Sequence, residues 1–118
     1  MISASLTMTP GFDWPEFGEW NFASPMEYSK DIVRFILDGD LEGAPGTRMN
    51  YNSGFSYLLS AIIQSVSDMR AADFARRHLF APWGIGDKVI WHEKHGNNLG
   101  ANGLRMLPAD MLRFGRLY

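Results

Sequence analysis

Pro45-Gly46-Thr47-Arg48-Met49-Asn50-Tyr51-Asn52-Ser53-Gly54 is the stretch of the 118-residue chain that decides the fold. Pro45 and Gly46 predict a turn, because proline fixes φ and glycine permits a positive φ. Asn52 and Ser53 each carry a side-chain oxygen that can accept a hydrogen bond from the first turn of a helix. The sequence therefore predicts a helix that begins directly after a structured turn at Tyr51.

The predicted helix carries an apolar stripe whose members recur every three or four residues and so share one face. They are Phe55, Leu58, Leu59, Ile62, Ile63, Val66 and Met69. A helix with this stripe is expected to be buried, and the turn before it then holds Tyr51 in a fixed direction, as a catalytic group requires. The alternative interpretation is a core tyrosine that packs beneath the turn.

Two helices are expected before the turn. Residues 2–9 are typical of the tail of a helix, which Pro10 and Gly11 end. Ser24-Pro25-Met26-Glu27 is typical of a helix start with Ser24 as the cap, and Gly39 is expected to end this helix. Its apolar face is formed by Tyr28, Ile32, Phe35 and Ile36.

An aromatic, acidic loop is predicted over residues 12–23, where no helical or strand period fits and Pro15 and Gly18 interrupt the chain. Loops rich in tryptophan and phenylalanine can rim a binding cleft. The alternative is that these rings simply cover the helices beneath them.

After the central helix, the sequence predicts a helix over Ala71–Leu79, a short strand within residues 88–92 and turns within residues 94–103. A last helix opens at Pro108. Its inward-facing residues are expected to be Met111, Leu112 and Gly115. The chain is thus predicted to be mainly α, with a minor β ribbon.

Composition limits the classes of protein that fit the chain. Hydrophobic residues make up 46% of the sequence, which is enough for a packed core. No apolar run approaches the roughly 20 residues that span a bilayer, and we expect no secretory leader. The absence of cysteine excludes disulfides, cysteine metal ligands and a cysteine nucleophile. The cellular compartment stays open.

Charge is distributed unevenly along the chain. Residues 1–45 carry eight acidic and two basic side chains, a net of −6, and residues 46–118 carry five acidic and nine basic ones, a net of +4. The two parts together give the net charge of −2. We interpret this asymmetry as mutual attraction between the two parts, and the overall charge predicts no nucleic-acid partner.

Four stretches resemble, in the same order, the serine β-lactamase-like hydrolases. They are Leu6-Thr7-Met8-Thr9-Pro10-Gly11-Phe12-Asp13-Trp14, then the Tyr51 turn with its helix, then Leu79-Phe80-Ala81-Pro82-Trp83-Gly84-Ile85, then residues 103–115. That family includes class C β-lactamases, penicillin-binding D-alanyl-D-alanine carboxypeptidases, related esterases and 6-aminohexanoate-dimer hydrolases. The resemblance implies that residues 1–118 are a single partial domain, the helical region of an α+β hydrolase.

The resemblance also implies a chemistry. In the resembling enzymes, the serine of a Ser-x-x-Lys helix start attacks a carbonyl group and forms an acyl-enzyme. The tyrosine of a Tyr-x-Asn/Ser turn takes and returns the proton, and a third motif with Lys or His before a glycine lines the other side. This assigns to Tyr51 the role of catalytic proton-transfer group, with no cofactor implied.

The partner motifs of Tyr51 are absent from the sequence. No serine is followed by lysine three positions later, and no Lys-Thr-Gly, Lys-Ser-Gly or His-x-Gly triplet occurs. A tyrosine with an ordinary pKa of about 10 is ionised in only about one molecule in a thousand at pH 7. It acts as a base only with nearby cations or hydrogen bonds, and Arg48 is close in sequence with its direction unknown. We therefore expect a fragment of a serine hydrolase that is inactive alone.

Ser53 is the candidate substrate-binding residue, because it stands where many relatives carry an asparagine that hydrogen-bonds a substrate amide in both directions. A serine hydroxyl reaches less far than an asparagine amide. This favours small esters and amides over β-lactams, in line with the likeness of residues 6–14 to the 6-aminohexanoate-dimer hydrolases. The alternative is that Ser53 is only a helix cap.

Other functions compete with the hydrolase interpretation. His92, Glu93 and His95 lie close together, but the zincin pattern needs two residues between the glutamate and the second histidine, on a helix. We therefore expect no metal site. The main alternative is a non-catalytic helical module, or a truncated product, that binds a partner or associates with itself through an exposed apolar patch. A third is a small-ligand-binding domain that uses the tryptophan-rich loop.

Overall fold

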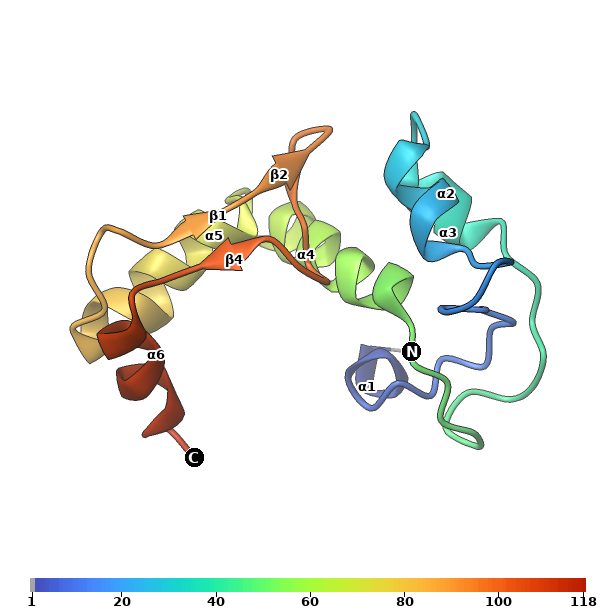
Figure 1. The fold of residues 1–118 in the computed structure, drawn as a ribbon, viewed down its shortest axis with the longest axis horizontal. Coiled ribbons are helices and arrows are strands. Elements are labelled where there is room, and N and C mark those ends of the chain that lie inside the picture. The colour runs from blue at the N-terminus through green and yellow to red at the C-terminus, as the bar shows by residue number, and fades with distance from the viewer. Residues whose placement is uncertain (1) are drawn as a thin grey trace. The chain divides into compact units, whose positions relative to one another are not determined.

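A computed structural model describes residues 2–118 and divides them into two compact units, of which the first ends at Leu59 and the second begins at Ser60 (Figure 1). Helices take up 45% of the residues and strands 9%, which confirms the prediction of a mainly α chain with a minor β component. Among the described residues, no helix is both long and apolar enough to cross a bilayer.

Six α-helices, a π-helical turn, a 3₁₀ turn and four two-residue strands follow one another along residues 2–118. They are α1 (Ile2–Leu6), α2 (Ala23–Tyr28), α3 (Ile32–Leu37), α4 (Ser53–Ser67), α5 (Ala71–Ala75), the π-helical turn η1 (Arg76–Phe80), the 3₁₀ turn η2 (Ala81–Trp83), β1 (Ile90–Trp91), β2 (Glu93–Lys94), β3 (Asn97–Asn98), β4 (Leu104–Arg105) and α6 (Pro108–Gly115).

In the first unit, residues 8–13 lie beside residues 40–50, and backbone hydrogen bonds join the two segments; this place is called the crossing below. Backbone hydrogen bonds close it from Asn50 N to Met8 O (2.7 Å), from Gly46 N to Thr9 O (2.8 Å) and from Asp13 N to Asp40 O (2.9 Å). Gly11 lies at the crossing with a φ of +82°, and a Cβ there would lie 2.4 Å from the carbonyl oxygen of Gly43. Since α1 already ends at Leu6, Gly11 serves this close approach rather than ending the helix.

Trp14 is central to the core of the first unit. Its buried indole makes edge contacts with Phe22 and Phe35, at ring-centroid distances of 5.5 and 6.4 Å. A Cβ at Gly54 would lie 2.6 Å from Trp14 Cη2. The first turn of α4 therefore packs directly onto the indole, and the glycine leaves room for it.

The single helix predicted from Ser24 to Gly39 is wrong, because the structure has two helices, α2 and α3, separated by residues 29–31. Asp31 has an extended backbone, with φ of −134°, and its carboxylate accepts a 3.0 Å hydrogen bond from the Arg34 N–H. A side chain that satisfies the backbone locally in this way ends one helix and starts the next.

The predicted Ser24 cap is also wrong. Phe22 occupies the N-cap position of α2 and makes no side-chain cap. Asn21 takes over this role, since its Oδ1 accepts a 2.9 Å hydrogen bond from the Ser24 N–H. The cap thus comes from an asparagine that lies one residue before the N-cap position.

The helix α4 begins directly after the Tyr51 turn, as predicted. Its cap is Asn52, whose Oδ1 accepts a 2.9 Å hydrogen bond from the Phe55 N–H. The predicted apolar stripe is buried only in part, because Phe55 is buried but Val66 is 79% exposed. Tyr57 is buried although it lies outside the stripe. The first half of α4 is packed on more than one side, which a single-face period does not describe.

In the second unit, the predicted helix over Ala71–Leu79 continues from α5 into the π-helical turn η1. Gly84 ends this helical region with a φ of +65°. The core beside it is formed by Phe80, Ile85 and Val89, with Ala75, Leu79, Met106 and Phe114 packed against them.

Asn98 supplies the cap that α5 lacks locally. Arg70 stands at the N-cap position without a side-chain cap, and the carboxylates of Asp73 and Glu93 that accept its hydrogen bonds raise its pKa above the ordinary value. The Oδ1 of Asn98 accepts a 2.8 Å hydrogen bond from the Ala72 N–H, 26 positions away. Because Asn98 lies so far along the chain from α5, the sequence around Ala71 gives no indication of this cap.

Two short antiparallel pairs form the β ribbon. They are β1 with β4 (Figure 1) and β2 with β3. The β2–β3 pair is joined by His95 and Gly96, which have φ values of +52° and +83°. Positive φ at both positions is typical of a tight two-residue hairpin turn. The strand expected within residues 88–92 is therefore present but shorter. Its partner β4 begins directly after the region predicted as turns, and β3 lies within that region.

The last helix, α6, begins at Pro108 as predicted, but the residues predicted to face inward are wrong. Met111, Leu112 and Gly115 are exposed. Phe114 packs against the core of the second unit, and Asp110, four residues earlier on the same face, is buried and pairs with Arg113 at 2.6 Å. The docking of Phe114 thus fixes which face of α6 is covered.

Replacing Asn98 by alanine is expected to lower the free energy of unfolding by about 2–4 kcal/mol. Asn98 is 2% exposed, and its Nδ2 also donates a 3.0 Å hydrogen bond to the Trp91 carbonyl oxygen. The substitution leaves this oxygen and the Ala72 N–H without partners. Urea denaturation followed by circular dichroism measures the change. The control is Asn97→Ala, the same change at a partly exposed neighbouring asparagine whose side chain makes no hydrogen bond among the described residues, and it should change the free energy of unfolding little. An Asn98→Ala protein of unchanged stability would contradict the remote cap.

Candidate active site at the Tyr51 turn

Tyr51 projects from the turn that precedes α4. Its side chain is 47% exposed, so it is not a core tyrosine. The ring stacks on Phe17, with 5.8 Å between the centroids and 24° between the planes. Within residues 2–118 no hydrogen bond engages the Tyr51 hydroxyl, which leaves it open to a group from outside.

Both neighbours of Tyr51 are anchored, although its own side chain is exposed. The Asn50 Nδ2 donates to the carbonyl oxygen of Trp14 at 3.1 Å, and its backbone N–H donates to Met8. On the other side, the Asn52 side chain is fully buried and caps α4. The backbone of Tyr51 is therefore fixed from both sides.

Glu16 ties the start of α4 to the aromatic loop. Its Oε2 accepts hydrogen bonds from Trp14 Nε1 at 2.7 Å and from the Ser53 N–H at 3.0 Å. Its Oε1 accepts from the Ser53 hydroxyl. A carboxylate at the N-terminus of a helix is also favoured by the helix dipole. The negative charge of Glu16 thus holds the first residue of α4.

Ser53 is bound by Glu16 through both its N–H and its hydroxyl. It is not the capping acceptor of α4, because Asn52 has that role. Its hydroxyl proton is directed to Glu16, and only the lone pairs of its oxygen stay available to a ligand. The role of Ser53 in substrate binding stays a prediction.

Glu16 is the residue that sequence reasoning missed. It lies 37 positions before Ser53, and no motif spacing connects the two. The loop over residues 12–23 combines both interpretations given to it, because Trp14 is buried in the core whereas Phe17 and Trp20 are exposed. The exposed Phe17 beside Tyr51 is the part of the loop that borders the candidate site.

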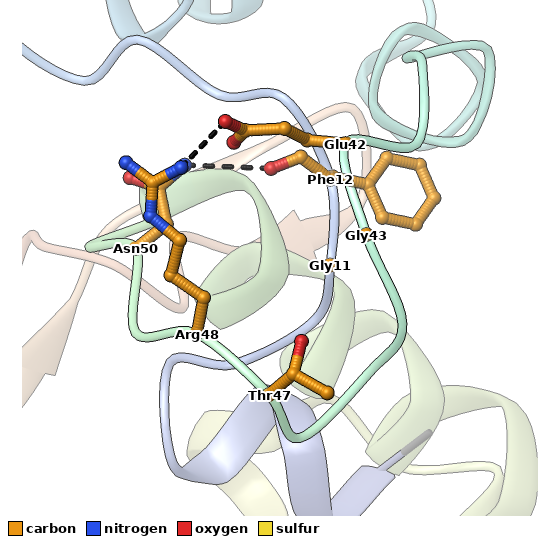
Figure 2. A pocket seen from close by; sticks show the side chains of 7 residues that line it. All are labelled: Gly11, Phe12, Glu42, Gly43, Thr47, Arg48 and Asn50. Atoms are coloured by element: carbon orange, nitrogen blue, oxygen red, sulfur yellow. Dashed lines mark hydrogen bonds and ion pairs between the residues drawn. The ribbon is translucent and has the colours of Figure 1, made fainter.

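Arg48, whose direction was open, pairs with Glu42 at 2.6 Å (Figure 2). The pair borders a cavity of about 150 Å³. The cavity is lined by Gly11, Phe12, Glu42, Gly43, Thr47, Arg48 and Asn50. The guanidinium charge is therefore engaged with a carboxylate, and no hydrogen bond joins Arg48 to Tyr51 among the described residues.

The second unit holds a mostly apolar cavity of about 420 Å³. Its lining includes Phe74 and His78, whose rings are 4.6 Å apart, together with Trp91 and Phe114. Self-association through such a surface stays a prediction. Across residues 2–118 no group of three or more histidine, aspartate or glutamate side chains is arranged to hold a metal ion.

A comparison with protein-family models matches residues 6–118 to the family described as Beta-lactamase. The match includes the Tyr51 turn, the loop that carries Glu16, and all of the second unit. A comparison with curated proteins gives no match.

Proposed function

We propose that this chain, which belongs to the beta-lactamase family, contributes Tyr51 as the proton-transfer group of a serine hydrolase that acts through an acyl-enzyme. The observation that supports this role is the combination of a half-exposed phenol with a turn anchored on both sides. Proton transfer requires such a group, because the hydroxyl must be accessible and its position must be fixed.

In the proposed reaction, a serine from outside the 118 residues attacks the carbonyl carbon of an ester or amide. Tyr51, as the phenolate, takes the serine proton while the new C–O bond forms. It then gives this proton to the departing alcohol or amine as the old C–O or C–N bond breaks. Water then attacks the acyl carbon, and Tyr51 takes a proton from it. As the acyl–serine C–O bond breaks, Tyr51 gives this proton to the serine oxygen, the carboxylic acid leaves and the starting state is restored.

The phenolate needs a cation that the described residues do not bring to Tyr51. Arg48 pairs with Glu42. Glu16 binds Ser53, two residues after Tyr51, and so adds negative charge to the turn. An opposite charge within about 4–6 Å is what favours the ionised form of such a group. We propose that the lysine of a Ser-x-x-Lys segment supplies this charge. The complete hydrolase is defined here as the polypeptide or complex that joins this chain to that segment.

The proposed substrates are small esters and amides. Because the Ser53 hydroxyl proton is directed to Glu16, Ser53 can accept a hydrogen bond from a substrate N–H but has no proton left for a substrate carbonyl. An asparagine amide at this position would do both. This difference favours compact substrates over those that need a two-sided amide contact.

The purified chain is expected to hydrolyse neither p-nitrophenyl acetate nor a chromogenic β-lactam above the buffer rate, because the attacking serine is not among its residues. Absorbance assays at several chain concentrations measure this, and heat-denatured chain serves as the control. Hydrolysis that rises with chain concentration and is lost in Tyr51→Phe would overturn the proposal that the nucleophile comes from elsewhere.

The competing function is a non-catalytic helical module that binds a partner. The coding sequence on either side of this chain separates the two proposals. A nearby Ser-x-x-Lys segment supports the hydrolase, and stop codons directly on both sides support the module.

A further inference from the structure

We infer that Glu16 is a positioning residue for Tyr51, and that it acts together with Phe17; the inference rests on the proposed function of Tyr51. The Glu16 clamp is defined here as Trp14, Glu16, Phe17, Tyr51 and Ser53. In this clamp, two consecutive loop residues hold two positions of the turn, since Glu16 binds Ser53 and Phe17 stacks on Tyr51.

The carboxylate of Glu16 is the connection between the loop and the turn. It accepts one hydrogen bond from its own loop, through Trp14 Nε1, and two from Ser53. Hydrogen bonds to an ionised acceptor are about twice as strong as neutral ones. The Ser53 N–H is moreover one of the helix-start donors that have no partner within α4, so Glu16 satisfies a group that Asn52 does not reach.

Phe17 restricts the orientation of the Tyr51 ring, because the two rings stack. Its side chain is 75% exposed, so it adds little to the core, and its ring contact is with Tyr51. An exposed tyrosine whose hydroxyl has no partner can otherwise occupy several staggered rotamers. Because Phe17 directly follows Glu16, loss of the carboxylate contacts releases the stacked ring as well.

The role differs from that of a purely structural residue. Trp14 is not held by Glu16 alone, since its indole also packs against Gly54, Phe22 and Phe35. Removing the charge of Glu16 should therefore leave the core in place. The effect should be confined to the groups that Glu16 binds, Trp14 Nε1 and Ser53, and to the Tyr51 ring.

The test uses three variants and tyrosine carrying ¹³C in the ring, in the 118-residue chain. Glu16→Gln keeps the size of the side chain but removes the charge and one acceptor, and Phe17→Leu removes only the stacked ring. Glu19→Gln is the matched control, because it makes the same change at an exposed acid of the same loop. The Tyr51 resonance among the four tyrosines is assigned with Tyr51→Phe.

In Glu16→Gln we expect the Ser53 amide to exchange roughly tenfold faster with solvent, and the Tyr51 ring resonance to move toward its position in the denatured chain. Phe17→Leu should move the ring resonance and leave the Ser53 amide unchanged, and Glu19→Gln should change neither. A Glu16→Gln chain that is folded by circular dichroism and keeps the wild-type Tyr51 resonance overturns the inference. If Glu16→Gln does not fold, Glu16→Asp replaces it, and its Tyr51 resonance must lie between the wild-type and denatured positions or the inference fails.

In the complete hydrolase, Glu16→Gln should lower kcat by about ten- to a hundredfold, because it disturbs the position of the proton-transfer group. A change in KM is expected only from the release of the Ser53 hydroxyl that Glu16 holds. Glu19→Gln should change neither constant. The resonance measurement needs no substrate, so the clamp can fail while Tyr51 keeps its proposed role. Equally, the clamp can hold in a chain whose Tyr51 proves to have no role in hydrolysis.

Discussion

Replacing Tyr51 by phenylalanine is expected to lower kcat/KM of the complete hydrolase by about 10²–10⁴-fold, the range that a positioned acid–base group contributes. The substitution removes only the hydroxyl, which has no partner among the described residues. The ring and its stacking on Phe17 can remain. The loss should therefore reflect proton transfer and not misfolding.

Initial rates with p-nitrophenyl acetate measure this effect, and circular dichroism checks the fold of the variant. The matched control is Tyr118→Phe, which removes a hydroxyl from a fully exposed tyrosine and should leave kcat/KM unchanged. A Tyr51→Phe enzyme with wild-type kcat/KM would remove the basis of the proposed function, whereas the clamp around Tyr51 would still be open to its own test.

Replacing Gly11 by alanine is expected to lower the free energy of unfolding by about 2–5 kcal/mol. About 1–2 kcal/mol of this comes from a side chain at positive φ, and the rest from forcing a Cβ into a filled site. The Cβ would lie 2.4 Å from the carbonyl oxygen of Gly43, at the crossing that sets up the Tyr51 turn. Since small domains are stable by only about 5–15 kcal/mol, the variant loses a large part of its stability.

Gly46 offers a matched control for this prediction. Its φ is +88°, but a Cβ there would meet no atom within 4 Å. Gly46→Ala should therefore show the backbone cost alone, about 1–2 kcal/mol. Urea denaturation of both variants isolates the cost of the close approach. Equal losses in the two would mean that the contact with Gly43 contributes nothing.

Local patterns predicted the parts of the fold that depend on neighbouring residues. The start of α4 follows from Asn52, and the start of α6 follows from Pro108, because caps and proline act within one helical turn. The sequence also contained a signal for the break between α2 and α3, since Asp31 can cap a helix. The apolar period that continues across Asp31 nevertheless favoured a single helix, and that prediction was wrong. The family likewise followed from short ordered motifs.

Contacts between distant segments were outside the reach of this reasoning. Asn98 caps α5 from 26 positions away, and Glu16 binds Ser53 from 37 positions away. Neither pair has a fixed spacing or a periodic pattern, because loops of any length can bring such residues together. Of the candidate site, Tyr51 and Ser53 were therefore named from the sequence, whereas Glu16, which binds Ser53, was not.

The rate of acyl-enzyme formation tests the proposed role of Tyr51 most directly. The complete hydrolase is mixed with substrate, quenched at short times and weighed intact by mass spectrometry, in the wild-type form and as Tyr51→Phe. We expect an acyl adduct on the serine of the Ser-x-x-Lys segment that forms at least about a hundredfold more slowly in the variant. An adduct that forms at the wild-type rate without the Tyr51 hydroxyl would contradict the account.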